Sequence, residues 1–243
     1  MKILCVIPSR INSTRLPRKP LVDIQGMPMI ARVLKNAQAC KVISKVIVAT
    51  DSEEIAEVVH AHGGEFEMTD PLLLTGSDRV AAVAKKYPEM DIVINLQGDG
   101  PFITPRMLEL LVEPYLKGET PEMTTLAYPL DMEKKYHEPG AVKVMTDLNG
   151  YALYFSRAPI PYFRAEPNCT VPVYHHMGLY AFRRDFLMTY TTLPQTPLEK
   201  TELLEQLRAM EHGYRIRVCL TEEKAMEIDT PQDLLEAQHF LLL

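Results

Sequence analysis

Residues 2–21, KILCVIPSRINSTRLPRKPL, join a short apolar run to a basic loop, and this combination decides the fold. The run at 2–8 is continuous and rich in Ile and Val, which is typical of a strand buried on both faces of a parallel sheet. The loop cannot form a continuous helix, because Pro17 and Pro20 interrupt it. Its cationic residues, all within ten positions, are Arg10, Arg15, Arg18 and Lys19.

Two further apolar runs and three helical patterns follow along the chain. The runs are KVIVAT (45–50) and DIVINL (91–96), and the helical patterns cover 29–40, 52–63 and 76–87. Thr50-Asp51 and Ser77 are the expected N-caps of the second and third helices. Alternating strands and helices are the signature of an open α/β sheet, and ligands of such sheets bind beyond the carboxyl ends of the strands. The basic loop follows the first strand, so it is predicted to hold an anion; the alternative is a solvated basic loop.

The middle of the chain has a different pattern, with little helix between its apolar runs. Strands are expected at 123–130, 141–147, 151–156 and 174–182, with a hairpin turn at DLNG (147–150). A helix at 197–213, a strand at 214–220 and a helix from Pro231 are expected to follow. We therefore predict a single domain over residues 1–243 with an open, mostly parallel sheet and an inserted β-rich section at roughly 123–182.

Composition limits the classes of function. The net charge is −6 and the pI is about 5.7, which disfavours a general nucleic-acid surface. The four cysteines form no C-x-x-C pair, and no run reaches the roughly 18 apolar residues of a membrane span. We expect a soluble cytoplasmic protein with free thiols.

Two aspartates are candidate metal ligands. Neither a Walker A loop nor a G-x-G-x-x-G motif occurs, so a P-loop kinase and a typical dinucleotide site are disfavoured. Asp99 lies between two glycines just after the third apolar run, where it could hold Mg²⁺ together with substrate phosphates, or could act only as a turn residue. Asp229 precedes Pro231, so it is either a metal ligand or part of a helix N-terminus.

The order of these motifs resembles the 3-deoxy-manno-octulosonate cytidylyltransferases, also called CMP-Kdo synthetases, from VIPSRINSTRLPRKPL to IDTPQDL. The stretches that carry the resemblance are GMPMI, VATDSEEIA, TGSDR, NLQGDGP, AVKV, YALYFSRAPIP, HHMGLYAF, PLE and LLEQLRAMEHG. The resemblance implies a Rossmann-like nucleotidyltransferase fold. It also implies transfer of CMP from CTP to the anomeric hydroxyl of 3-deoxy-manno-octulosonate (Kdo), with release of pyrophosphate, for lipopolysaccharide or capsule biosynthesis.

The same resemblance implies a role for each candidate residue. The catalytic set is Arg10, Lys19 and Asp99; the nucleotide-binding set is Arg10, Ser13, Arg15, Lys19, Ser77 and Arg79. The residues expected at the sugar acid are Gln97, Arg157, His176, Glu205 and Gln206, and the magnesium ligands are Asp99 and Asp229. Because His175 and His176 are consecutive on a predicted strand, at most one of them faces the site. A homodimer formed through the β-rich section is also implied.

One position departs from the family pattern. The family commonly reads G-D-E-P where this chain has G-D-G-P, so Gly100 replaces an acid next to Asp99. Its absence is expected to leave room in the pocket. Three interpretations follow: the ordinary sugar acid is used; a related acceptor is used, such as 8-amino-Kdo, another 2-keto sugar acid or a phosphonate; or the chain is an inactive nucleotide-binding relative.

Overall fold

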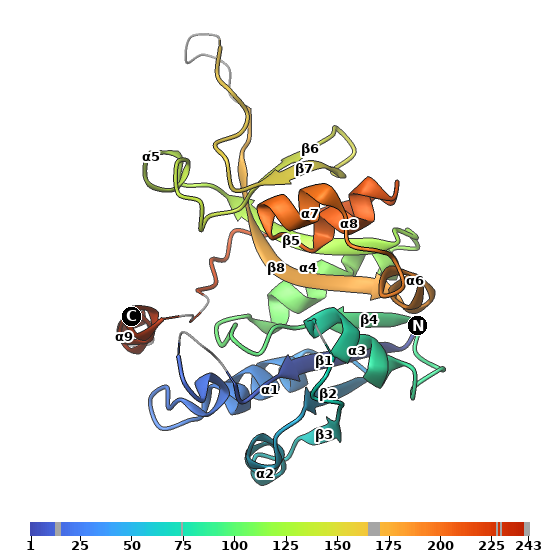
Figure 1. Ribbon diagram of the computed structural model, residues 1–243, viewed down its shortest axis with the longest axis vertical. Helices are drawn as coiled ribbons and strands as arrows, with labels where there is room; N and C mark the ends of the chain where they lie inside the picture. Colours follow the sequence, from blue (N-terminus) through green and yellow to red (C-terminus); the bar gives the residue numbers. More distant parts are fainter. Residues whose placement is uncertain (13–15, 74, 165–170, 227, 229, 241–243) are drawn as a thin grey trace. The chain divides into compact units, whose positions relative to one another are not determined.

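The computed structural model describes residues 1–243 except 13–15, 74, 165–170, 227, 229 and 241–243 (Figure 1). The chain forms two compact units. Unit 1 contains Met1–Glu109 and Ala225–Leu243, and unit 2 contains Leu110–Lys224. Two compact units do not decide whether the chain folds as one domain, so the single domain stays a prediction.

Unit 1 is built on parallel strands. β1 (Ile3–Ser9) lies between β2 (Lys45–Thr50) and β4 (Ile92–Asn95), and β3 (Glu65–Met68) pairs with β2. The interior of β1 is buried on both faces, as its continuous apolar sequence predicts. The apolar runs predicted three of these strands, but not β3, whose residues are mostly exposed.

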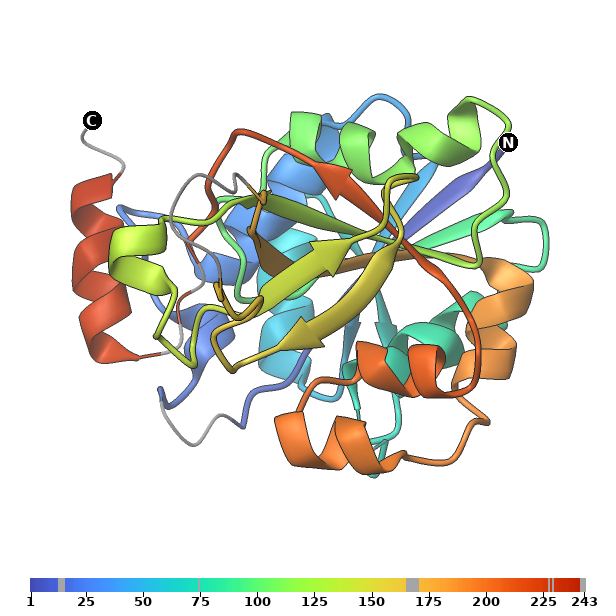
Figure 2. The same ribbon diagram turned by 90° about the horizontal axis from the view of Figure 1, so that it is seen from above.

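The helices of unit 1 cover both faces of these strands. They are α1 (Met29–Ala39), α2 (Glu53–Ala61) and α3 (Gly76–Ala84); unit 1 also contains α9 (Pro231–Phe240) and the 3₁₀ turn η1 (Lys19–Leu21). The strands lie in the order β3-β2-β1-β4. The chain therefore moves across the sheet in one direction from β1 to β3 and then returns to the other side of β1 to form β4. Since parallel crossovers are right-handed, this reversal places α1 and α3 on opposite faces (Figure 2). The loops after β1 and β4 therefore diverge at a topological switch point, where α/β sheets bind ligands.

Two predicted N-caps are wrong by one or two residues. Thr50 still belongs to β2, and the side chain of Ser52 caps α2 by accepting from the backbone N–H of Ile55. The cap of α3 is Thr75, which forms a capping box with Asp78. The acidic residue three positions after Thr75 is the signal that favours it over Ser77.

Unit 2 is mixed and largely antiparallel, as predicted for the middle of the chain. β5 (Met123–Pro129) pairs antiparallel with β8 (Tyr174–Arg183) and parallel with β9 (Ile216–Leu220). β6 (Lys143–Thr146) and β7 (Ala152–Ser156) form the expected hairpin around DLNG. The remaining helices of the middle section are α4 (Pro105–Leu116), α5 (Met132–Lys135) and α6 (Arg184–Tyr190).

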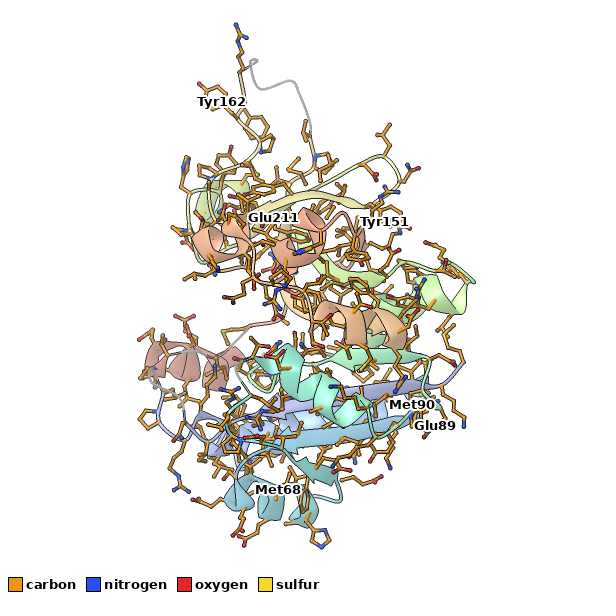
Figure 3. All side chains as sticks on the ribbon, turned by 45° about the vertical axis from the view of Figure 1, so that its right-hand side comes forward. Met68, Glu89, Met90, Tyr151, Tyr162 and Glu211 are labelled. Carbon is orange, nitrogen blue, oxygen red and sulfur yellow. The ribbon has the colours of Figure 1, made fainter. Side chains whose placement is uncertain are left out.

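The helix predicted at 197–213 is two short helices, α7 (Pro197–Glu202) and α8 (Gln206–Glu211). Leu203 has a φ of 53°, a left-handed conformation that ends α7. Glu211 ties the two helices together, because its carboxylate accepts from the backbone N–H of Leu198 at 3.1 Å and of Glu199 at 3.3 Å (Figure 3). Among the described residues, no helix is long and apolar enough to cross a membrane.

Candidate functional site

Lys19 and Asp99 meet at the switch point of unit 1. The Lys19 ammonium donates to the Asp99 carboxylate at 2.7 Å, although 80 positions separate the two residues. Lys19 begins η1 and is nearly buried, whereas about a third of the Asp99 side chain is exposed. The pair leaves part of a carboxylate open to a ligand beside a fixed cation.

The other cations of the basic loop lie in different environments. Arg10 donates to the backbone carbonyl of Leu73, which links the loop after β1 to the segment before α3. Arg18 is exposed and pairs with Glu54 of α2. Ser13 and Arg15, both expected at the nucleotide, lie outside the described residues.

The backbone at Gly98 passes close to the backbone of Pro8, which leaves no room for a side chain at position 98. A Cβ there would lie 3.0 Å from the carbonyl oxygen of Pro8, so a side chain would push the loops after β1 and β4 apart. Gly100 is different: it is buried, and a Cβ would lie 3.1 Å from Cγ1 of the Ile103 side chain. The expectation that Gly100 leaves room is therefore wrong on the side to which its Cβ would point, because Ile103 fills that space.

The residues expected around cytidine are buried. Ser77 accepts from the side-chain amide of Asn95 at 3.3 Å. Arg79 is wholly buried, pairs with Asp51 at 2.9 Å and donates to Thr69. Burial lowers the pKa of Arg79, and its Nε has no hydrogen-bond partner among the described residues. Arg79 thus holds the segments around α3 together from the inside.

Gln97 follows β4 and remains half-exposed. Its Nε2 donates to the Asn95 side-chain oxygen at 3.4 Å, a long hydrogen bond that connects it to the buried Ser77. Asn95 is wholly buried and was not among the predicted site residues. A polar residue at the end of an apolar strand is the signal that could have revealed it.

The candidate metal ligands are described only in part. Among the described residues, no group of three or more His, Cys, Asp or Glu side chains is placed to hold a metal ion. Asp229 lies outside the described residues. The backbone N–H of Ile228 donates to the carbonyl oxygen of Asp99 at 3.1 Å. A single accessible carboxylate fits Mg²⁺, which commonly binds one or two carboxylates and completes its octahedron with water and phosphate oxygens.

Arg157 is held in unit 2 by three backbone carbonyls. Its Nε donates to Glu202 at 2.7 Å, Nη1 to Pro139 at 3.0 Å and Nη2 to Leu203 at 3.5 Å. A guanidinium has five N–H donors, so one remains on each terminal nitrogen. Two adjacent N–H donors of a guanidinium can bind the two oxygens of a carboxylate.

The two consecutive histidines on β8 are both neutral at physiological pH. His176 is buried and bonds the hydroxyl of Thr125 at 2.8 Å; burial lowers its pKa to about 3. His175 bonds the hydroxyl of Tyr128 at 2.6 Å, and burial lowers its pKa to about 4. His176 therefore offers a ligand a neutral imidazole, not a cation.

Gln206 is the first residue of α8, and Glu205 precedes it. Gln206 is buried, and its Oε1 accepts from Tyr180 at 2.9 Å, while its Nε2 has no hydrogen-bond partner among the described residues. Glu205 is half-buried, and its backbone carbonyl accepts from Tyr190 at 2.7 Å. The Gln206 amide nitrogen is thus a buried donor inside unit 2.

The described part of the chain thus brings the predicted residues together in two groups. Arg10, Lys19, Ser77, Arg79, Gln97 and Asp99 lie in unit 1, and Arg157, His176, Glu205 and Gln206 lie in unit 2. Two residues that the sequence analysis missed, Lys143 and Glu202, contact Arg157 directly.

Sequence comparisons relate the chain to cytidylyltransferases along its whole length. A family model described as "Cytidylyltransferase" matches residues 4–218. The 3-deoxy-manno-octulosonate cytidylyltransferase of Acaryochloris marina is 56% identical over 241 residues, covering 99% of this chain and 98% of the relative. The enzyme of the same name from Synechococcus elongatus is 48% identical over 237 residues, covering 98% and 97%.

Solved structures show the same relation. A CMP:2-keto-3-deoxy-manno-octonic acid synthetase complexed with CTP matches with a TM-score of 0.94 and 39% identity, covering 100% of this chain and 99% of that one. A 4-diphosphocytidyl-2C-methyl-D-erythritol synthase from Anaerococcus prevotii matches with a TM-score of 0.66 at 13% identity, which is a likeness of fold alone.

Proposed function

The chain belongs to the cytidylyltransferase family, and we propose how its residues carry out the family's reaction. It is a nucleotidyltransferase with the predicted α/β fold, a mostly parallel open sheet with a small extra β-hairpin. It transfers CMP from CTP to the anomeric hydroxyl of Kdo and releases pyrophosphate, the step that activates Kdo for lipopolysaccharide biosynthesis. The observation that carries the residue assignment is the Lys19–Asp99 pair at the switch point of unit 1.

Lys19 and Arg10 bind the triphosphate of CTP, with Ser13 and Arg15 shaping the same loop. The anomeric hydroxyl oxygen attacks the α-phosphorus in line and its proton passes to solvent, while the bond from the α-phosphorus to the bridging oxygen breaks and pyrophosphate leaves with the electron pair. The cations beside the phosphates stabilise the charge that develops in this step. Ser77 and Arg79 support the cytidine pocket from inside unit 1, since both are buried.

Asp99 and Asp229 are the residues that would hold a magnesium ion. When bound, Mg²⁺ neutralises phosphate charge and lowers the pKa of a coordinated hydroxyl. The accessible part of the Asp99 carboxylate supports this assignment, as does the hydrogen bond from Ile228, the neighbour of Asp229, to the Asp99 backbone.

Unit 2 contributes Arg157, His176, Glu205 and Gln206 to the proposed binding of the sugar acid. Arg157 binds the carboxylate through its two remaining N–H donors, which the three carbonyl contacts hold in place. His176, Glu205 and Gln206 of unit 2 bind hydroxyl groups, and the predicted role of Gln97 in unit 1 is likewise toward the acceptor. Kdo is the proposed acceptor, and an 8-amino analogue is the alternative that Gly100 raises.

The chain works as a homodimer in the cytoplasm. Large apolar side chains on the β-rich section support the dimer: Tyr162 is 86% exposed and Leu153 is 61% exposed (Figure 3). Free cysteines support a reducing compartment: among the described residues, Cys5, Cys40 and Cys219 are free thiols.

Pyrophosphate release tests the proposal. The purified protein with Mg²⁺ is given each of the four ribonucleoside triphosphates, with Kdo and with 8-amino-Kdo. We expect turnover with CTP and Kdo and at least tenfold lower kcat/KM with the other nucleotides. A preference for UTP or ATP, or CTP binding without turnover on any acceptor, contradicts the proposal.

A further inference from the structure

Lys143 is a wholly buried lysine in the middle of unit 2. It begins β6, and its ammonium donates to the backbone carbonyls of Arg157 at 2.7 Å and Glu138 at 2.9 Å. Burial lowers the pKa of Lys143, so its charge is costly to keep at this position. An apolar residue in β6 would make the same strand hydrogen bonds without this cost.

The two carbonyls that Lys143 binds belong to segments that position Arg157. One belongs to Arg157 itself, and the other belongs to Glu138, which precedes the Pro139 carbonyl that accepts from Arg157 Nη1. Lys143 therefore fixes both the backbone from which the Arg157 side chain starts and the turn against which it rests.

Glu202 holds the same arginine from α7. Its carboxylate accepts from the Arg157 backbone N–H at 2.9 Å and from the Ser156 hydroxyl at 2.6 Å. Its backbone carbonyl accepts from Arg157 Nε. Both backbone polar groups of Arg157 are thus bound by charged side chains, an arrangement that sets the direction of one side chain.

We infer that Lys143 is a positioning residue for the acceptor, acting through Arg157. It holds the Arg157 backbone and the 138–139 turn so that the two remaining guanidinium donors face the sugar acid carboxylate. This inference rests on the proposed function, in which Arg157 binds that carboxylate. On this inference, the buried Lys143 ammonium is retained despite its free-energy cost because it orients Arg157 for acceptor binding.

The test is steady-state kinetics on Lys143→Met, Arg157→Lys and the double variant, with Kdo and CTP varied separately. We expect Lys143→Met to raise the KM for Kdo about tenfold or more and to change the KM for CTP less than twofold. In the Arg157→Lys background the same change should have little further effect, because residues that act through one contact are not additive. Lys134→Met, at an exposed position of α5, is the matched control and should change neither KM.

Each outcome separates the inference from the proposed function. If Arg157→Lys raises the Kdo KM but Lys143→Met does not, the inference is wrong and the role of Arg157 stands. If Arg157→Lys has no effect, the assignment of Arg157 is wrong, and the inference fails with it. If the effects of Lys143→Met and Arg157→Lys on the KM for Kdo are additive, Lys143 does not act through Arg157 and the inference is wrong.

A second variant is used if Lys143→Met does not fold. Lys143→Gln keeps a hydrogen-bond donor without the charge, and the same kinetic comparison is made with it if Lys143→Met does not give a cooperative thermal transition. If neither variant folds, Lys143 is required for the fold itself, and a positioning role in acceptor binding is overturned.

Discussion

Lys19 in unit 1 and Lys143 in unit 2 show two uses of a buried cation. Lys19 lies after a parallel strand, is 9% exposed and faces a carboxylate that is partly open to solvent. Lys143 is the first residue of β6, is 0% exposed and donates to two backbone carbonyls. Unit 1 thus presents charge where a ligand can reach it, whereas unit 2 uses charge and neutral polar groups to fix geometry. Removing charge from unit 1 should change the rate, and changing polar groups in unit 2 should change geometry or stability.

The largest effect expected is the loss of rate in Lys19→Ala. The ammonium stabilises charge on the transferring phosphate, so kcat should fall by on the order of 10²–10³. Arg18→Ala is the matched control, because Arg18 is the neighbouring cation but is exposed and pairs with Glu54. Pyrophosphate release and thermal melting are measured for both variants. Equal losses in the two variants would mean that the loop acts through its total charge, not through Lys19.

A smaller effect is expected when the pH is lowered, which should reduce the stability of unit 2. Burial lowers the pKa of His176 to about 3, so between pH 3 and its unfolded pKa of roughly 6.5 the unfolded chain binds more protons. Above about pH 6.5 His176 therefore does not lower the free energy of unfolding. As the pH falls below about 6.5, the unfolded chain gains the proton and stability is lost. One such group costs about 2 kcal/mol at pH 5.

Urea unfolding at pH 7 and pH 5 measures this dependence. His176→Gln, which cannot take up the proton, should lose about 2 kcal/mol less than the wild type between the two pH values. The control is His60→Gln, at an exposed position of α2 in unit 1. If His176→Gln shows the same pH dependence as the wild type, the imidazole is not held neutral in the folded protein.

The fold was predictable where the hydrophobic pattern was strong. Continuous apolar runs located β1, β2 and β4, because strands covered on both faces need apolar side chains at every position. β3 was missed because Glu65 and Glu67 break that pattern, and exposed edge strands tolerate charge. The break at Leu203 was missed for another reason: a leucine with a positive φ has no signature in the sequence.

The site was predictable in its position but not in its supporting contacts. The carboxyl ends of β1 and β4 pointed to the basic loop and to Asp99, and the family resemblance joined them. No spacing rule links residues 80 positions apart, so the Lys19–Asp99 contact needed the fold. The lone lysine in the apolar stretch AVKV was a signal for Lys143, since lysine is rarely fully buried without a partner.

The smallest effect is expected at Gly100, where the chain departs from its family. Its φ is not positive, so a side chain is compatible with the backbone, but a Cβ would press on Ile103 at 3.1 Å. Gly100→Ala adds only that Cβ, and Gly100→Glu adds the carboxylate as well, so their difference isolates the charge. A negative group beside Asp99 acts on an acidic acceptor, and we expect Gly100→Glu to shift the ratio of kcat/KM for Kdo and 8-amino-Kdo by up to about tenfold. The KM for CTP should change less than this ratio, and Gly100→Ala should change neither.

Competition between the two acceptors measures the ratio in all three proteins. If Gly100→Ala shifts the ratio as much as Gly100→Glu, displacement of Ile103 and the loop accounts for the effect, and the missing carboxylate has no part in choosing the acceptor.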